Sequence, residues 1–99
     1  MELNIHFHKH GRKFGIGTVA EYERMADAFM FGQMNADTRQ CTRPSGKDRL
    51  RHNFANRYFG VACVNPAFVR TFYPVENYII ASHGGQQQFF AFECGRRIL

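Results

Sequence analysis

The chain has 99 residues, a mass of 11.5 kDa and a formal net charge of +5, from 13 basic and 8 acidic residues. This length allows one domain, and the apolar fraction of 44%, with eleven Phe and four Tyr, is typical of a folded core and argues against intrinsic disorder. No stretch approaches the roughly 18–20 consecutive apolar residues of a membrane span, and the N-terminus lacks the apolar centre of a signal peptide. The basic charge favours a polyanionic partner.

The first segment contains three histidines, His6, His8 and His10, with Lys9 between the last two. In a strand the three imidazoles share a face and indicate a zinc or nickel site, although the sequence offers no second cluster of ligands. In a helical turn His6 and His10 share a face with Lys9 beside them, which favours a role in proton transfer. A polar N-terminus without a role is the third interpretation.

A helix is predicted from about Thr18 to Phe31. Thr18 and Glu21 form a capping-box pattern, and Gly32 stands where a left-handed helix end is expected. Apolar side chains recur at three- and four-residue spacing, at Val19, Tyr22, Met25, Ala26, Phe29 and Met30. We therefore expect this helix to pack on a core through one face.

Four short antiparallel strands are predicted to follow, at Gln40–Arg43, Arg49–Phe54, Tyr58–Val64 and Phe68–Tyr73. The turns between them are marked by Pro44-Ser45-Gly46-Lys47, by residues 55–57 and by Asn65-Pro66. Residues 75–99 contain two apolar patches separated by Gly84-Gly85, which predict either a fifth strand or a lid over the sheet. The predicted fold class is α+β, with N-terminal helical segments packed on a four- to five-stranded antiparallel sheet, in a single domain over residues 1–99.

The whole net charge is concentrated in residues 39–57, which carry +5 through Arg39, Arg43, Lys47, Arg49, Arg51 and Arg57 against Asp48. In the second strand Leu50, His52 and Phe54 share one face, whereas Arg49, Arg51 and Asn53 point the other way. Guanidinium groups at alternate positions stand about 6.6 Å apart, close to the spacing of successive phosphates along a nucleic-acid strand. The alternative is a solvated charged face without a ligand.

Three cysteines, Cys41, Cys63 and Cys94, are an odd number with wide spacing and no CxxC motif. We expect three small apolar side chains in a reducing compartment, rather than one bridge and one free thiol.

The order of five segments carries a resemblance to a known family: HFHKHGRKFG, TVAEYERMADAFMFG, CTRPSGKDRLRHN, YFGVACV and VRTFYP. Together they resemble the barnase–EndoU–colicin–RelE group of toxin ribonucleases, in the form found at the C-termini of polymorphic and contact-dependent inhibition toxins. The resemblance covers about residues 6–74. Where we expect that group to have a Tyr-Asp pair, this chain has His52-Asn53.

The resemblance implies a metal-independent endoribonuclease without a cofactor, in which the RNA 2′-hydroxyl attacks the adjacent phosphate and leaves a 2′,3′-cyclic phosphate. It implies that His10 transfers protons and that Lys9 and Arg51 stabilise the phosphorane. Thr71 is expected to contact a phosphate oxygen. Tyr73, on the same strand face, is expected to stack a base or assist proton transfer.

Substrate contacts are expected at Arg43, Arg49, Arg57 and His52, with His52 and His83 in reserve for the second acid–base role. The implied partners are RNA, tRNA included, and an acidic immunity protein, with no membrane. The implied place of action is the cytoplasm of a target bacterial cell, after delivery as the C-terminal domain of a larger secreted toxin. Two alternatives remain: a non-catalytic RNA- or DNA-binding module that uses the same arginine hairpin, and a metal-binding regulator that uses the three N-terminal histidines.

Overall fold

The computed structural model describes residues 14, 15 and 17–96. Within them the chain forms α2 (Val19–Phe31), a meander of β1 (Thr38–Thr42), β2 (Asp48–Asn53), β3 (Tyr58–Val64) and β4 (Ala67–Pro74), then α3 (Asn77–Ser82) and α4 (Gln86–Gly95). The strands are antiparallel and lie in chain order in one sheet. The predicted α+β class, with a helix packed on a four-stranded antiparallel sheet, is confirmed. The N-terminal histidine segment, for which the sequence allows a strand or a helical turn, lies outside the described residues.

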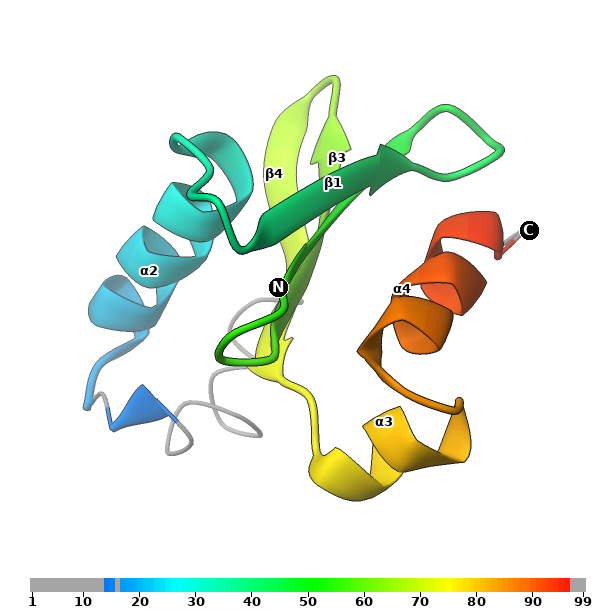
Figure 1. The fold of residues 1–99 in the computed structure, drawn as a ribbon. Coiled ribbons are helices and arrows are strands. Elements are labelled where there is room, and N and C mark those ends of the chain that lie inside the picture. The colour runs from blue at the N-terminus through cyan, green and yellow to red at the C-terminus, as the bar shows by residue number, and fades with distance from the viewer. Residues whose placement is uncertain (1–13, 16, 97–99) are drawn as a thin grey trace.

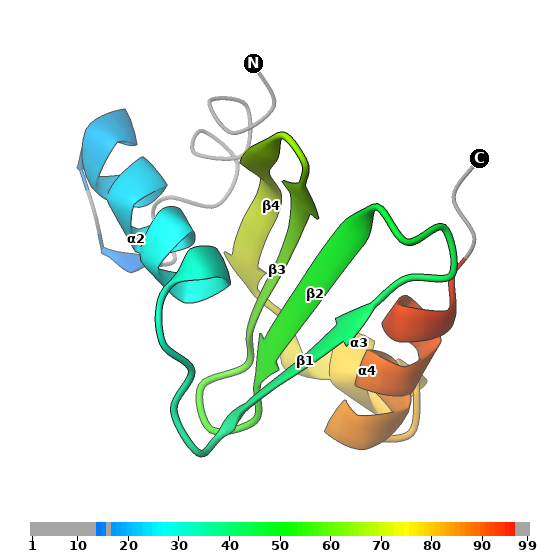
Figure 2. The ribbon, with the colours of Figure 1, turned by 90° about the horizontal axis from the view of Figure 1, so that it is seen from above.

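The two faces of the sheet are covered by different helices, as Figures 1 and 2 show. One core joins α2 to β3 and β4 and consists of Tyr22, Ala26, Met30, Ala62, Val69 and Phe72. The other joins the sheet to the C-terminal helices and consists of Leu50, Phe59, Val61, Val75, Ile80 and Phe89. The alternation predicted for β2 is confirmed: Leu50 and His52 face the C-terminal helices, whereas Arg49 and Arg51 face α2.

The helix α2 begins as its sequence predicts. Thr18 is the N-cap, and its Oγ1 accepts a hydrogen bond from the backbone N–H of Glu21 at 3.1 Å and donates one to the Glu21 carboxylate at 2.9 Å. The left-handed helix end expected at Gly32 is wrong, because its φ is −78° and its ψ is −178°. A Cβ at this position would collide with the carbonyl oxygen of Ala28, so close approach to the helix makes glycine necessary here.

The C-terminal segment is helical and covers the sheet. Of the two alternatives that the sequence left open, the fifth strand is therefore wrong and the lid is the one observed. Its two helices pack against the sheet face that carries Leu50 and Phe59. Gly84 and Gly85, both with positive φ, make the tight connection between α3 and α4.

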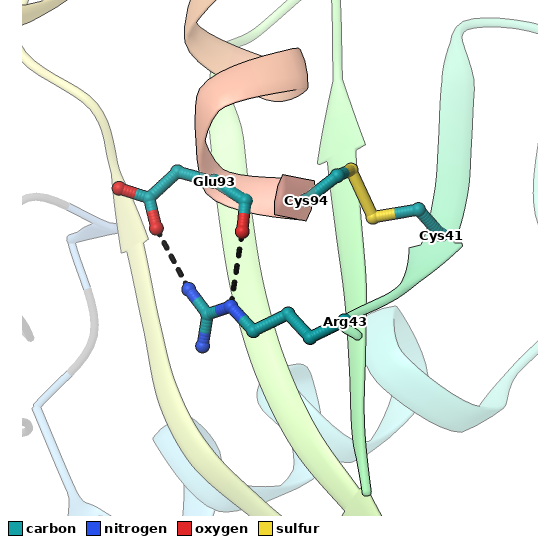
Figure 3. The surroundings of a disulfide bond; sticks show 4 residues. All are labelled: Cys41, Arg43, Glu93 and Cys94. Carbon is teal, nitrogen blue, oxygen red and sulfur yellow. Dashed lines mark hydrogen bonds and ion pairs between the residues drawn. A yellow bond between two sulfur atoms is a disulfide. The ribbon is translucent and has the colours of Figure 1, made fainter. Parts of the chain in front are cut away.

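A disulfide bond joins Cys41 of β1 to Cys94 of α4, across 53 residues of sequence (Figure 3). The expectation of three reduced cysteines is therefore wrong. Cys63 is free and buried in β3. The alternative of one bridge and one free thiol is the arrangement that the fold adopts, because the last turn of α4 packs beside the edge strand.

Candidate nucleic-acid interface

The side chains that the sequence singled out lie on opposite faces of the sheet. Arg51 stands opposite Gly60 in the register, and Gly60 stands opposite Phe72, on the face that α2 covers. Thr71 pairs with Val61, and Tyr73 packs against the core beneath the C-terminal helices. Thr71 and Tyr73 thus share a face, as predicted, but the structure does not bring them together with Arg51. Lys9 and His10 lie outside the described residues.

Arg51 is buried, with 7% of its surface exposed, and its guanidinium holds the end of α2. Its Nη1 donates to the carbonyl oxygens of Phe29 at 3.0 Å and Gly32 at 2.6 Å, and its Nε donates to Oε1 of Gln40 at 2.7 Å. These carbonyls belong to the last turn of the helix and lack partners within it. A cation at this end also interacts favourably with the helix dipole.

Arg49 lies two residues from Arg51 on the same face and is only half-buried. Its Nη1 lies 3.5 Å from the carbonyl oxygen of Met30, and its guanidinium lies 5.9 Å from the centre of the Phe31 ring. Burial lowers the pKa of Arg51 from its usual value, and the positive charge of Arg49 lowers it further. An arginine side chain carries a positive charge in a protein, so this strand face holds two cations at alternate positions, and an anion bound between them would relieve their repulsion.

The part of this sheet face over β1 and β2 carries neutral polar and cationic side chains. Its residues, which we call the arginine face, are Thr38, Gln40 and Thr42 from β1 and Arg49, Arg51 and Asn53 from β2. Gln40 and Thr42 are exposed. None of these six side chains is a carboxylate. In the part of the chain that the structure describes, α2 covers β3 and β4 and leaves β1 uncovered on this side (Figure 2).

A cavity of about 280 Å³ adjoins the arginine face and shares Thr38 and Asn53 with it. Its lining contains four residues with side-chain amides and three with aromatic rings, together with apolar residues: Gln33, Asn35, Asn53, Asn56, Phe29, Tyr58, Phe72, Met25, Ala28 and Met34. Asn53 is held firmly, because its Nδ2 donates to Thr38 Oγ1 at 3.1 Å and its Oδ1 accepts backbone N–H groups of the following turn. Amides and rings are the groups that contact base edges and base faces in single-stranded RNA.

Arg43 lies inside the molecule and not on a free surface. Its Nη2 lies 2.7 Å from the Glu93 carboxylate and its Nε donates to the Glu93 carbonyl oxygen at 3.0 Å (Figure 3). Its Nη1 lies 3.6 Å from Asp48, which in turn binds Arg70 at 3.0 Å. Arg96 Nη1 donates to both oxygens of the same Glu93 carboxylate, to Oε1 at 3.1 Å and to Oε2 at 3.3 Å. The expected contact of Arg43 with substrate is therefore replaced by a chain of ion pairs that joins β2, β4 and α4.

Arg57 connects the β2–β3 turn to the start of the C-terminal segment. Its Nε donates to the carbonyl oxygen of Val75 at 3.1 Å, and its backbone has a φ of 66°. Asn and Asp adopt such a φ more readily than Arg does. The half-buried side chain of Arg57 thus has a structural contact on the side of the sheet away from the arginine face.

His52 is fully buried and is held by Gln86 of α4. Gln86 donates its amide N–H to the carbonyl oxygen of Phe54 at 2.9 Å, so its Oε1, 2.9 Å from His52 Nε2, must accept a hydrogen bond from the imidazole N–H. Burial lowers the pKa of His52, and the bond to Gln86 opposes this shift in part. A neutral imidazole enclosed by Phe59, Phe89 and other rings is poorly placed to contact RNA.

Tyr73 is half-buried beside the ion-pair chain. Burial raises the pKa of its phenol, the charge of Glu93 raises it further, and Arg96 and Arg43 oppose the shift. The group is therefore a neutral phenol at physiological pH. Thr71 is half-buried on the same face. Both remain candidates as hydroxyl groups, but the C-terminal helices pack on the face that they occupy.

Gln40 and its neighbours on β1 were missed as candidates from the sequence. The pattern Thr38, Gln40, Thr42 has the two-residue period of one strand face. Pairing the hairpin around the turn at residues 44–47 would have placed these side chains opposite Arg49 and Arg51. The last turn of α2, which also borders the site, has no such local signal.

Metal and membrane features can be judged only for the described residues. Among them, no three His, Cys, Asp or Glu side chains gather at distances suited to a metal ion, and the three N-terminal histidines lie outside this part of the chain. None of the helices described is long and apolar enough for a membrane crossing.

Comparison of the chain with protein-family models, with curated proteins and with solved structures gives no match. The resemblance to toxin ribonucleases therefore depends on the five sequence segments alone.

Proposed function

We propose that this chain is a toxin ribonuclease that binds single-stranded RNA on the arginine face and cleaves it without a metal ion. The observation that carries the proposal is the pair Arg49 and Arg51, two cations at alternate positions of β2, on a carboxylate-free face beside a cavity whose lining includes four side-chain amides and three aromatic rings. A phosphate between the two guanidinium groups relieves their repulsion, and an adjoining base fits the chemistry of the cavity.

In the proposed reaction His10 accepts the proton of a 2′-hydroxyl, and the 2′-oxygen attacks the adjacent phosphorus. The bond from phosphorus to the 5′-oxygen then breaks, which gives a 2′,3′-cyclic phosphate and a 5′-hydroxyl that takes a proton from a second acid. Arg49 donates to the non-bridging oxygens, where negative charge grows in the phosphorane, and the charges of the buried Arg51 and of Lys9 stabilise the same oxygens. Thr71 and Tyr73 lie on the other face and receive no step.

The same proposal includes an inhibitor and a place of action. A face with two cations and no carboxylate suits an acidic immunity protein, which would compete with RNA for it. Delivery as the C-terminal domain of a larger secreted toxin would bring the chain into the cytoplasm of a target bacterial cell, where tRNA and other RNA are available.

A second candidate function is RNA or DNA binding without cleavage. It is favoured by the internal contacts of Arg43, Arg51 and His52, because three of the side chains expected to act on substrate also hold the fold together. A binding module needs only the exposed part of the arginine face, so cleavage of RNA separates the two functions.

The binding step is tested with two arginines that differ in the face they occupy. Arg49→Gln removes a charge from the arginine face, and Arg39→Gln removes the same charge from the opposite face of the neighbouring strand. Binding to a fluorescent single-stranded RNA is measured over a range of salt concentrations. Arg49→Gln should weaken binding and reduce the slope of log K against log salt by about 0.7, as expected for one lost phosphate contact. Equal losses in both variants would contradict the proposed interface.

A further inference from the structure

The C-terminal cover, by which we mean residues 75–96, is attached to the sheet covalently at one end. The disulfide Cys41–Cys94 joins the last turn of α4 to the edge strand β1 (Figure 3). Beneath the cover lie His52, Phe59 and the half-buried Tyr73. The role of the disulfide depends on how well the cover would stay in place without it.

The helices of the cover are weak in isolation. α3 has 6 residues and α4 has 10, and neither N-cap residue, Glu76 or Gly85, makes a side-chain capping bond. Neither helix has a basic residue in its last turn to interact with the helix dipole. Helices shorter than about 12–15 residues are marginal in water, so their order depends on packing against the sheet.

The cover buries few apolar side chains, and two features of its packing oppose closure. Its buried apolar side chains are Val75, Ile80 and Phe89. The ion pair of Glu93 with Arg43 is buried, and the desolvation of both groups offsets much of their attraction. Closure also leaves the Nδ1 atom of His52 buried, with no hydrogen-bond partner among the described residues.

We propose that the cover is a redox latch: the disulfide-bonded chain is closed, and reduction of Cys41–Cys94 allows α3 and α4 to leave the sheet. The disulfide suits this role because it lies at the C-terminal end of α4, beside the ion pair of Glu93 with Arg43, whereas the hydrogen bonds of Gln86 hold the other end of that helix. Both cysteines are half-exposed, so a small thiol can reach the bond. The latch does not depend on RNA binding, since it concerns the opposite face of the sheet.

The chemical step is a thiol–disulfide exchange with a dithiol. One thiolate of the reductant attacks a sulfur of the bond and forms a mixed disulfide, and the other cysteine leaves as a thiolate that takes up a proton. The second thiol of the reductant then attacks the sulfur that the reductant contributes to the mixed disulfide. The bond to the remaining protein cysteine breaks, and this cysteine leaves as a thiolate that takes up a proton. Two electrons pass to the protein, the dithiol becomes a cyclic disulfide, and both cysteines end as thiols.

The redox state of the compartment decides whether the cover is closed or open. An oxidising exterior keeps the cover closed, and a reducing cytoplasm opens it. Opening uncovers the imidazole of His52 and more of Tyr73, and it lets the His52 Nδ1 atom bind water. The open chain therefore presents a second sheet face that the oxidised chain does not.

The test is amide hydrogen exchange of the full chain, measured by mass spectrometry with and without dithiothreitol. Reduction should accelerate exchange in Asn77–Ser82 and Gln86–Gly95 by about tenfold or more beyond any acceleration in α2 and β3, whose exchange rises only as far as the stability of the whole fold falls. Reoxidation should restore the protection of the cover. Unchanged exchange in the cover would overturn the latch, and so would equal acceleration throughout the chain, because the bond would then stabilise the fold as a whole.

Two variants control for the reductant. Cys41→Ser/Cys94→Ser should exchange like the reduced chain without any dithiol, and Cys63→Ala, which keeps the bond, should exchange like the oxidised chain. If the double variant does not fold, the comparison of exchange in the reduced and oxidised wild-type chain decides whether the latch exists. Loss of the whole fold on reduction of the wild type would count against the latch.

Discussion

Arg49 and Arg51 show how two identical side chains on one strand face acquire different roles. Arg51 uses its guanidinium on Gln40 and on the carbonyl groups that end α2, and 7% of its surface remains exposed. Arg49 is half-buried and has only weak contacts, one with the Met30 carbonyl oxygen at 3.5 Å and one with the Phe31 ring at 5.9 Å. Arg51 therefore builds the arginine face, and Arg49 is the cation most available to an incoming phosphate.

This difference predicts unequal effects on stability. Arg51→Met should lower the free energy of unfolding by about 2–4 kcal/mol, because two helix-end carbonyls and Gln40 lose a charged donor. Arg49→Met should change it by less than about 0.5–1 kcal/mol, since a partly exposed contact contributes little. Urea unfolding followed by circular dichroism measures both, and similar losses would show that Arg51 does not hold α2.

The buried His52 makes stability depend on pH. Its pKa is lowered in the folded chain by burial, so the unfolded chain binds protons more readily. The stability that His52 contributes is complete above its unfolded pKa of about 6.5 and is lost as pH falls below that value. We expect the free energy of unfolding, measured in urea, to fall from pH 7 to pH 5 by as much as about 1.4 kcal/mol per pH unit from this group.

Two histidine variants separate His52 from other groups that titrate in this range. His52→Gln should flatten the dependence between pH 5 and pH 7, although it lowers stability overall. His83→Gln, a change at the half-buried C-cap of α3, should leave the slope as in the wild type. If the free energy of unfolding of His52→Gln still falls between pH 7 and pH 5, the dependence comes from other residues.

Strand alternation predicted the facing of these side chains but not their contacts. The period of two places Arg49 and Arg51 together and His52 opposite, as the fold confirms. The partners of Arg51, however, come from α2, about twenty residues earlier in the chain. A guanidinium that is buried against a helix end and one that is only weakly held have the same local sequence pattern, so only the tertiary structure distinguishes them.

At the level of elements, the helices and strands with strong local sequence signals were predicted correctly. α2 has a cap and a continuous apolar stripe, and the strands lie between clear turns, so their bounds agree within two residues. The C-terminal helices lack these signals, because they are short, have no side-chain caps and are joined by two glycines. Their helical form depends on the sheet beneath them.

The start of α2 offers a direct test at this scale. Thr18→Ala removes the side-chain oxygen that accepts the Glu21 N–H, and it should lower the free energy of unfolding by about 1 kcal/mol. Thr18→Ser keeps the hydroxyl and should stay within a few tenths of the wild type. The midpoint of urea unfolding measures both changes, and an equal loss in Thr18→Ser would assign the effect to the lost methyl group.

At the scale of the whole molecule, one sheet separates two cores, and the disulfide fastens the second of them. The sequence did not predict this pair, since Cys41 and Cys94 are 53 positions apart and meet only because α4 lies beside β1. The concentration of positive charge in residues 39–57 was predictable. Its division between the arginine face, the ion-pair chain and the opposite sheet face was not.

Reduction should therefore lower global stability as well as loosen the cover. A bond that closes a loop of this length stabilises a chain by about 4 kcal/mol through the entropy of the unfolded state. Urea unfolding with and without dithiothreitol measures the difference, with Cys63→Ala as the control that keeps the bond. A difference below about 1 kcal/mol would show that the closed form gains little from the disulfide.

The central claim is that this chain cleaves RNA with the arginine face as its phosphate site. Its most direct test is incubation of the folded, purified chain with RNA in EDTA, followed by mapping of the new ends. We predict 2′,3′-cyclic phosphate and 5′-hydroxyl ends, a rate lowered by about 10²-fold or more in His10→Ala and clearly lowered in Arg49→Gln, and an unchanged rate in Arg39→Gln. RNA that stays intact while the chain binds it, or cleavage that His10→Ala and Arg49→Gln leave unchanged, would contradict the account.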